Sequence, residues 1–129
     1  MKSKTISKMA GITVLITGIG HTATHIFLQF LPNPYPELEK AMAASKVNFG
    51  GDISVLDFQN GFSLTMGVLL IGLGIHIFRN MDKTGLLINL FVTSAITGIS
   101  ICYFPPFVII LLSLSFLMII VSLLRYDNQ

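Results

Sequence analysis

The sequence predicts an all-α fold, an integral membrane four-helix bundle that forms one domain over residues 1–129. The first observation is composition: 53% of the residues are hydrophobic, only 11% are charged, and the mean hydropathy is +0.79. Soluble domains have about 25% charged residues, so this chain lacks the polar side chains to cover a soluble surface. The second observation is four separate apolar runs, each long enough to cross a bilayer.

The first predicted span covers residues 9–30 and is apolar apart from a polar stripe. Residues four apart lie on the same side of a helix. A polar group that faces hydrocarbon is costly, so we expect the stripe to face protein or water. The stripe consists of Thr13, Thr17, His21, His25 and Gln29.

Lysines before this span also fit the basic start of a secretory signal. Two histidines inside the apolar run, and the lack of a small-residue cleavage site directly after it, favour an uncleaved first span.

The connection over residues 31–58 is the only long one. Three prolines within five residues of LPNPYPE end the first helix. A short amphipathic helix from Pro36 to Phe49 follows, and we expect it to lie on the membrane surface or over the mouth of the bundle. The segment Gly50-Gly51-Asp52 predicts a turn. A plain surface loop is the alternative for this connection.

The remaining spans are predicted at residues 59–78, 84–103 and 107–124. Glycine patterns in the first two spans, GITVLITGIG and GVLLIGLG, indicate close helix packing rather than nucleotide binding. The fourth span is the most apolar, and its serines can bond to their own backbone. We therefore expect the fourth span to face lipid most.

Basic residues predict the topology. Four spans put both termini on one side, together with Lys2, Lys4, Lys8, Arg79, Lys83 and Arg125. The other side has only Lys40 and Lys46, among four carboxylates. We therefore predict cytoplasmic termini, with the amphipathic helix facing the periplasm or the exterior.

Counting about 1.5 Å of rise per residue from the outer ends of the spans brings polar residues of three spans to similar depths. The predicted ligand-binding residues are His21, His25, Gln29, Gln59, Asn60, Ser63 and Thr97, with Ser100 nearby and Asp52 and Asp57 as caps from the loop. His76 lies near the opposite end, about 15 Å from the depth of His21.

This offset argues against one metal ion bound by all three histidines, since Zn–N bonds measure about 2.0–2.1 Å, and it disfavours a bis-histidine haem that joins His76 to His21. The pair His21 and His25 has a spacing that metal sites use, but it lacks the glutamate of HExxH. No metal ligand is assigned, and the cofactor stays open. Interhelical hydrogen bonding is the simpler interpretation of both histidines.

Three stretches, GIGHTATHIF, LDFQNGFSLTMGVLLIGLG and YFPPFVIILLSLSF, resemble an uncharacterised family of small bacterial four-span integral membrane proteins. The resemblance covers most of the chain and implies a bacterial inner-membrane protein, but no catalytic residues. The general shape is also similar to small four-span bundles that bind apolar ligands, such as the DoxX-like and sterol-isomerase-type groups.

Three functions remain open. The first is the binding of an apolar or lipid-like small molecule in an intramembrane pocket lined by His21 and His25. The second is a role as an oligomerising interaction or transport subunit. The third is a membrane enzyme, or a metal or haem protein, that uses the same histidines. The net charge of +2 does not indicate a nucleic-acid partner.

Overall fold

The computed structural model describes residues 2–47, 52–103 and 105–126, and it is helical throughout. No strand occurs in these ranges, apart from an isolated bridge between Lys46 and Ser54. Four helices are long and apolar enough to cross a membrane, which confirms the predicted multi-span architecture. The helices are α1 (Ser3–Leu28), α2 (Pro36–Ala44), α3 (Val55–Arg79), α4 (Lys83–Tyr103) and α5 (Pro106–Tyr126), and α2 is the short one.

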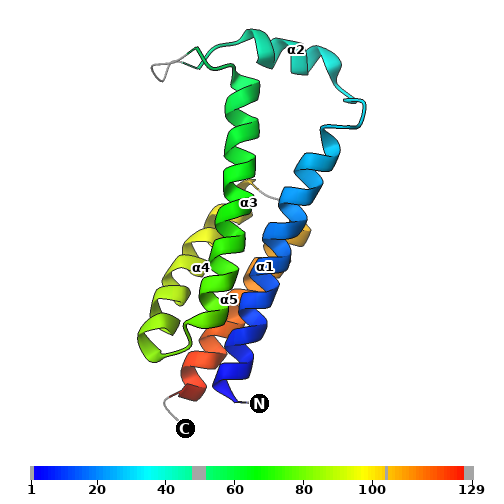
Figure 1. Cartoon of the computed structure of the whole chain (residues 1–129). Helices are drawn as coiled ribbons and strands as arrows, with labels where there is room; N and C mark the ends of the chain where they lie inside the picture. Colours follow the sequence, from blue (N-terminus) through cyan, green and yellow to red (C-terminus); the bar gives the residue numbers. More distant parts are fainter. Residues whose placement is uncertain (1, 48–51, 104, 127–129) are drawn as a thin grey trace.

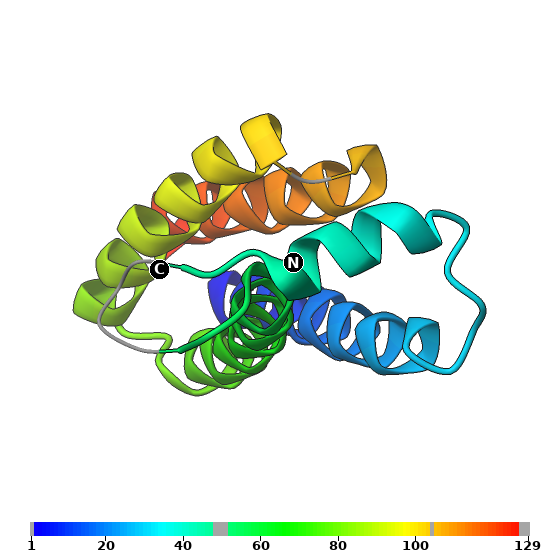
Figure 2. The ribbon, with the colours of Figure 1, turned by 90° about the horizontal axis from the view of Figure 1, so that it is seen from above.

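The long helices pack in the order α3, α1, α5, α4, since α1 contacts α3 and α5, and α4 contacts α5. Figure 1 shows the two ends of the chain and the α3–α4 connection at one end of the bundle, with α2 at the other. We call these the terminal end and the α2 end. Seen from above, α4 and α5 form one layer and α1 and α3 the other (Figure 2). The tips of α1 and α3 extend beyond the α4–α5 connection (Figure 1).

Glycines allow α1 and α3 to approach each other closely. A Cβ atom added at Gly11 would lie 2.7 Å from the backbone nitrogen of Phe78, and one at Gly18 would lie 2.6 Å from that of Ile71. A Cβ atom at Gly74 would lie 2.5 Å from the backbone nitrogen of Leu15. These contacts confirm that the glycine patterns serve helix packing.

The expectation that the fourth span faces lipid most is wrong, because α5 lies between α1 and α4. The Ser115 hydroxyl donates to the carbonyl of Ala10 (3.1 Å), and the Ser122 hydroxyl donates to that of Ser3 (3.0 Å). These serines therefore bond across the α1–α5 interface rather than to their own helix. Hydropathy did not predict this position, because an apolar side chain suits a packed interface and lipid equally well.

Several helix boundaries differ from the prediction, and α3 begins at Val55 rather than residue 59, because Ser54 caps it there. Helix α1 begins at Ser3 rather than residue 9, because Ser3 and Ser7 are buried and Ser3 bonds to α5. Helix α2 ends at Ala44, because Ser45 is extended and the chain turns back, with Val55 N–H donating to the Ser45 carbonyl (2.9 Å). The predicted helix end at Phe49 and the Gly50-Gly51 turn lie outside the described residues.

Candidate functional site

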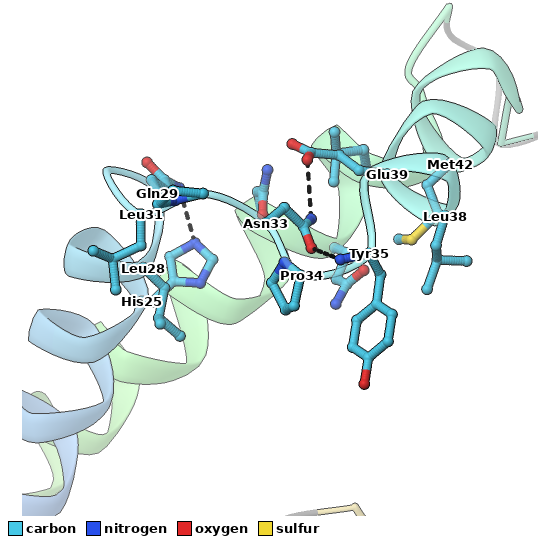
Figure 3. A pocket seen from close by; sticks show the side chains of 14 residues that line it. His25, Leu28, Gln29, Leu31, Asn33, Pro34, Tyr35, Leu38, Glu39 and Met42 are labelled. Atoms are coloured by element: carbon cyan, nitrogen blue, oxygen red, sulfur yellow. Dashed lines mark hydrogen bonds between the residues drawn. The ribbon is translucent and has the colours of Figure 1, made fainter.

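The α2 end of the bundle contains a cavity of about 560 Å³ (Figure 3). Four segments enclose it: the last turn of α1, the linker that follows, α2, and the first turns of α3. No residue of α4 or α5 lines it. The lining residues are His25, Leu28, Gln29, Leu31, Pro32, Asn33, Pro34, Tyr35, Leu38, Glu39, Met42, Leu56, Gln59 and Asn60.

The linker is held in place by Asn33. Its side-chain oxygen accepts from the backbone N–H of Tyr35 (2.8 Å), which is the local turn that asparagine favours before proline-rich segments. Its side-chain nitrogen donates to the Glu39 carboxylate (2.9 Å), as Figure 3 shows. The linker and α2 are therefore joined by side-chain hydrogen bonds at the edge of the cavity.

Part of the cavity lining is polar. His25 Nε2 and the side-chain nitrogen of Gln29 lie 3.2 Å apart on α1. Gln59 and Asn60 come from the start of α3, where Ser54 caps the helix by accepting from the Asp57 N–H (3.0 Å). None of these four side chains is a carboxylate. They offer hydrogen-bonding groups of one imidazole, from His25, and three amides, from Gln29, Gln59 and Asn60.

The apolar lining residues come from all four segments. They are Leu28, Leu31, Leu38, Met42 and Leu56. Figure 3 shows Leu38 and Met42 on one side of α2, together with the ring of Tyr35. Leu38 is 58% exposed and Tyr35 68%, so this apolar side of α2 is only partly covered by the protein itself. The cavity is therefore open on one side, and its lining mixes polar and apolar side chains.

His21 does not line the cavity. It lies one turn before His25 on α1, and its Nε2 atom is 3.1 Å from both the carbonyl oxygen and the hydroxyl oxygen of Ser63. Beside this contact, a Cβ atom at Gly67 would overlap the hydroxyl of Thr22, while the His21 ring would stay at an ordinary contact distance of 3.4 Å. His21 and Ser63 thus form an interhelical hydrogen-bonded pair between the cavity and the glycine contacts of α1 and α3.

Thr97 and Ser100 lie apart from the other predicted site residues. Both belong to α4, which supplies no residue to the cavity. The Ser100 hydroxyl donates to the Ile96 carbonyl of its own helix (2.6 Å). The Thr97 hydroxyl is buried and has no hydrogen-bond partner among the described residues. The depth count fails to separate these residues from the cavity, because equal depth does not mean adjacent helices, and α3 and α4 make few contacts.

The two loop carboxylates make contacts of their own. Asp57 accepts from the hydroxyl of its cap Ser54 (2.6 Å), and Asp52 pairs with Lys46 at 3.2 Å. No group of three or more His, Cys, Asp and Glu side chains that could hold a metal ion occurs in the described ranges.

His76 lies at the terminal end. Its Nδ1 atom is 3.0 Å from the side-chain nitrogen of Asn80, whose carbonyl in turn accepts from Asn89 (3.2 Å). Asn89 therefore donates a hydrogen bond to the C-cap residue of α3.

We did not predict from the sequence that the apolar residues and the linker residues line the cavity. The signal was present in the amphipathic pattern of Leu38 and Met42, which predicted a helix over the bundle mouth. Nothing in the sequence pattern predicted that Leu28, Leu31 and Leu56 line the cavity, because apolar residues at span ends are common.

No family model, curated protein or solved structure matches this chain.

Proposed function

We propose that this chain is a membrane protein that binds an apolar or lipid-like small molecule in the cavity at the α2 end. The observation that supports this most directly is one half-open cavity of about 560 Å³ whose lining mixes apolar side chains with a few polar ones. Small-molecule sites in proteins are mostly apolar and contain a few placed polar groups. An amphiphile, with one polar end and one apolar chain, matches both kinds of lining residue.

The polar end of the ligand would contact His25, Gln29, Gln59 and Asn60, and its chain would lie against Leu38 and the other apolar residues. The only carboxylate in the lining, Glu39, is already hydrogen-bonded by Asn33. A neutral hydroxyl, ester or amide head group therefore suits these polar side chains better than a strongly charged head group does. His21, one turn before His25, joins α1 to α3 next to the site through its contact with Ser63.

We further propose that both termini are cytoplasmic and that α2 is periplasmic, in a bacterial inner membrane, as in the small four-span family that the sequence resembles. Basic residues favour the cytoplasmic side. Those of the terminal end are Lys2, Lys4, Lys8, Arg79, Lys83 and Arg125. At the α2 end, Lys40 and Lys46 are each paired with an acid, at 3.1 and 3.2 Å.

Photolabelling tests the proposed cavity. The probe is a monoacylglycerol with a diazirine in its acyl chain, which has a neutral head and one chain. We expect adducts on peptides that contain residues 25–42 and 56–60 of the purified protein. Leu38→Trp would fill the apolar part of the cavity and suppress these adducts.

Leu117→Trp is the matched control, because Leu117 is 56% exposed on α5 and lies outside the cavity. This variant should retain the wild-type adducts. Adducts spread evenly over the exposed faces of α4 and α5, unchanged by Leu38→Trp, would contradict the proposed site.

A second candidate function, self-association as an interaction subunit, is favoured by one observation on α3. Cβ atoms added at Gly61 and Gly72 would meet nothing within 4 Å, unlike those at Gly67 and Gly74. Small residues on an outward helix face allow close helix–helix contact in membranes. Disulfide crosslinking of Gly72→Cys in a Cys102→Ser background tests this face, and a strictly monomeric product contradicts it.

A further inference from the structure

A second feature lies at the terminal end, on the seam between α1 and α3. The Lys8 ammonium lies over the ring of Phe78, 5.4 Å from its centroid. Arg79 follows Phe78 in the last turn of α3, and both Lys8 and Arg79 are exposed. Helices α1 and α3 thus each place one cation at the terminal end of the seam between them.

Apolar side chains continue this seam toward the middle of the bundle. On α1, Ile12 and Ile16 follow Lys8 at four-residue spacing and are 43% and 58% exposed. On α3, Ile75 precedes Phe78 by three residues and is 46% exposed. Residues at these spacings share a helix face, so an exposed apolar track begins at the two cations.

The cations lack acidic neighbours. The salt bridges found in the described residues, Lys40–Glu37 and Lys46–Asp52, are both at the α2 end. Asp82, in the α3–α4 connection, accepts from the backbone N–H of Gly85 (3.0 Å). Lys8 and Arg79 thus form no salt bridge among the described residues, and the chemical complement of this pair of cations is an anion.

We propose that this seam binds an anionic phospholipid. Lys8 and Arg79 hold the phosphate, and one acyl chain lies along Ile12, Ile16 and Ile75. Basic side chains beside a span attract anionic headgroups, and an apolar track directly adjoining them distinguishes a phospholipid from a free phosphate. This site is separate from the cavity at the α2 end and does not depend on the function proposed for it.

Native mass spectrometry of the full chain in a neutral detergent tests the proposal. The probes are phosphatidylglycerol and phosphatidylcholine with identical acyl chains, offered in equal amounts. We expect the wild-type protein to bind phosphatidylglycerol preferentially. In Lys8→Gln/Arg79→Gln the preference should fall roughly twentyfold to thirtyfold, since one basic residue near an anionic lipid is worth about fivefold in affinity.

Two variants control for charge and folding. Lys2→Gln/Lys83→Gln removes the same charge from the same end and should largely keep the preference. Lys8→Arg/Arg79→Lys preserves both charges and should also keep it. The proposal is overturned if Lys8→Gln/Arg79→Gln retains the wild-type preference, or if both Gln pairs reduce it equally, since the latter indicates a diffuse field rather than a site.

Discussion

The Nε2 atom of His21 lies 3.1 Å from both the carbonyl oxygen and the hydroxyl oxygen of Ser63, which joins the last third of α1 to α3. A protonated Nε2 donates to one of the two oxygens, whereas an unprotonated Nε2 accepts from the Ser63 hydroxyl, so the tautomer decides the direction of the bond. In either state the imidazole meets protein rather than hydrocarbon. This contact explains how an apolar span accommodates this histidine.

His21→Leu should destabilise the protein by about 0.6–1.7 kcal/mol, the range of single hydrogen bonds between membrane helices. Ser63→Ala should cost less, because the Ser63 carbonyl remains as a partner for the ring. SDS-induced unfolding of both single variants and the double variant measures the coupling between them. Strictly additive effects would mean that the Ser63 hydroxyl is not a partner of His21.

Gly74→Ala should destabilise the protein by about 1–3 kcal/mol, because the new methyl group would overlap the backbone of Leu15. Gly72→Ala is the matched control on the same helix. Its Cβ atom would meet nothing within 4 Å, and alanine is the better helix former by about 1 kcal/mol. Thermal unfolding in detergent should therefore rank Gly74→Ala well below wild type and Gly72→Ala at or above it. Equal behaviour of the two variants would contradict the packing of α3 on α1.

Ser115→Ala should loosen α5 from α1 by about 0.6 kcal/mol, because the Ala10 carbonyl loses a donor from across the interface. Ser113→Ala, at a less buried position of α5, should have a smaller effect. The measurement is again unfolding in SDS. A larger loss at Ser113 than at Ser115 would mean that α5 is rotated relative to the structure described here.

Asn89→Leu should leave stability within about 1 kcal/mol of wild type, although Asn89 is fully buried. Its Oδ1 atom has no hydrogen-bond partner in the described part of the chain, and a buried unpaired oxygen costs about 1–3 kcal/mol. That cost offsets the single bond that Asn89 donates to Asn80. A loss of more than about 2 kcal/mol would show that Oδ1 does have a partner, such as a buried water.

Cysteine labelling checks the proposed topology. In a Cys102→Ser background, Ala43→Cys in α2 should react with a membrane-impermeant maleimide added to intact cells. Thr84→Cys, at the start of α4, should react only after the membrane is opened. Both positions are exposed in the structure, so access to the reagent depends on the side of the membrane alone. The reverse pattern would place the termini outside.

Local sequence predicted the helices well, and the errors occurred where a long-range contact decided the outcome. The first span was predicted to begin at residue 9, but α1 begins at Ser3, because Ser3 bonds to Ser122, which is 119 residues away. The inward polar stripe was inferred from four-residue spacing alone, and Thr17 is indeed buried while His21 and His25 are partly buried. Thr97 followed the same spacing rule on α4, yet α4 does not reach the cavity.

The sequence by itself determined the number of long apolar helices, their approximate ends and the polar face of the first one, because these depend on hydropathy and on the 3.6-residue period of a helix. Only the tertiary structure decided which helices are neighbours. In that structure α5 lies between α1 and α4, α4 lies at the edge of the bundle, and the linker and α2 line the cavity. The physical reason is that lipid and a helix interface are equally apolar, so contacts between distant residues such as Ser115 and Ala10, and not hydropathy, select the arrangement.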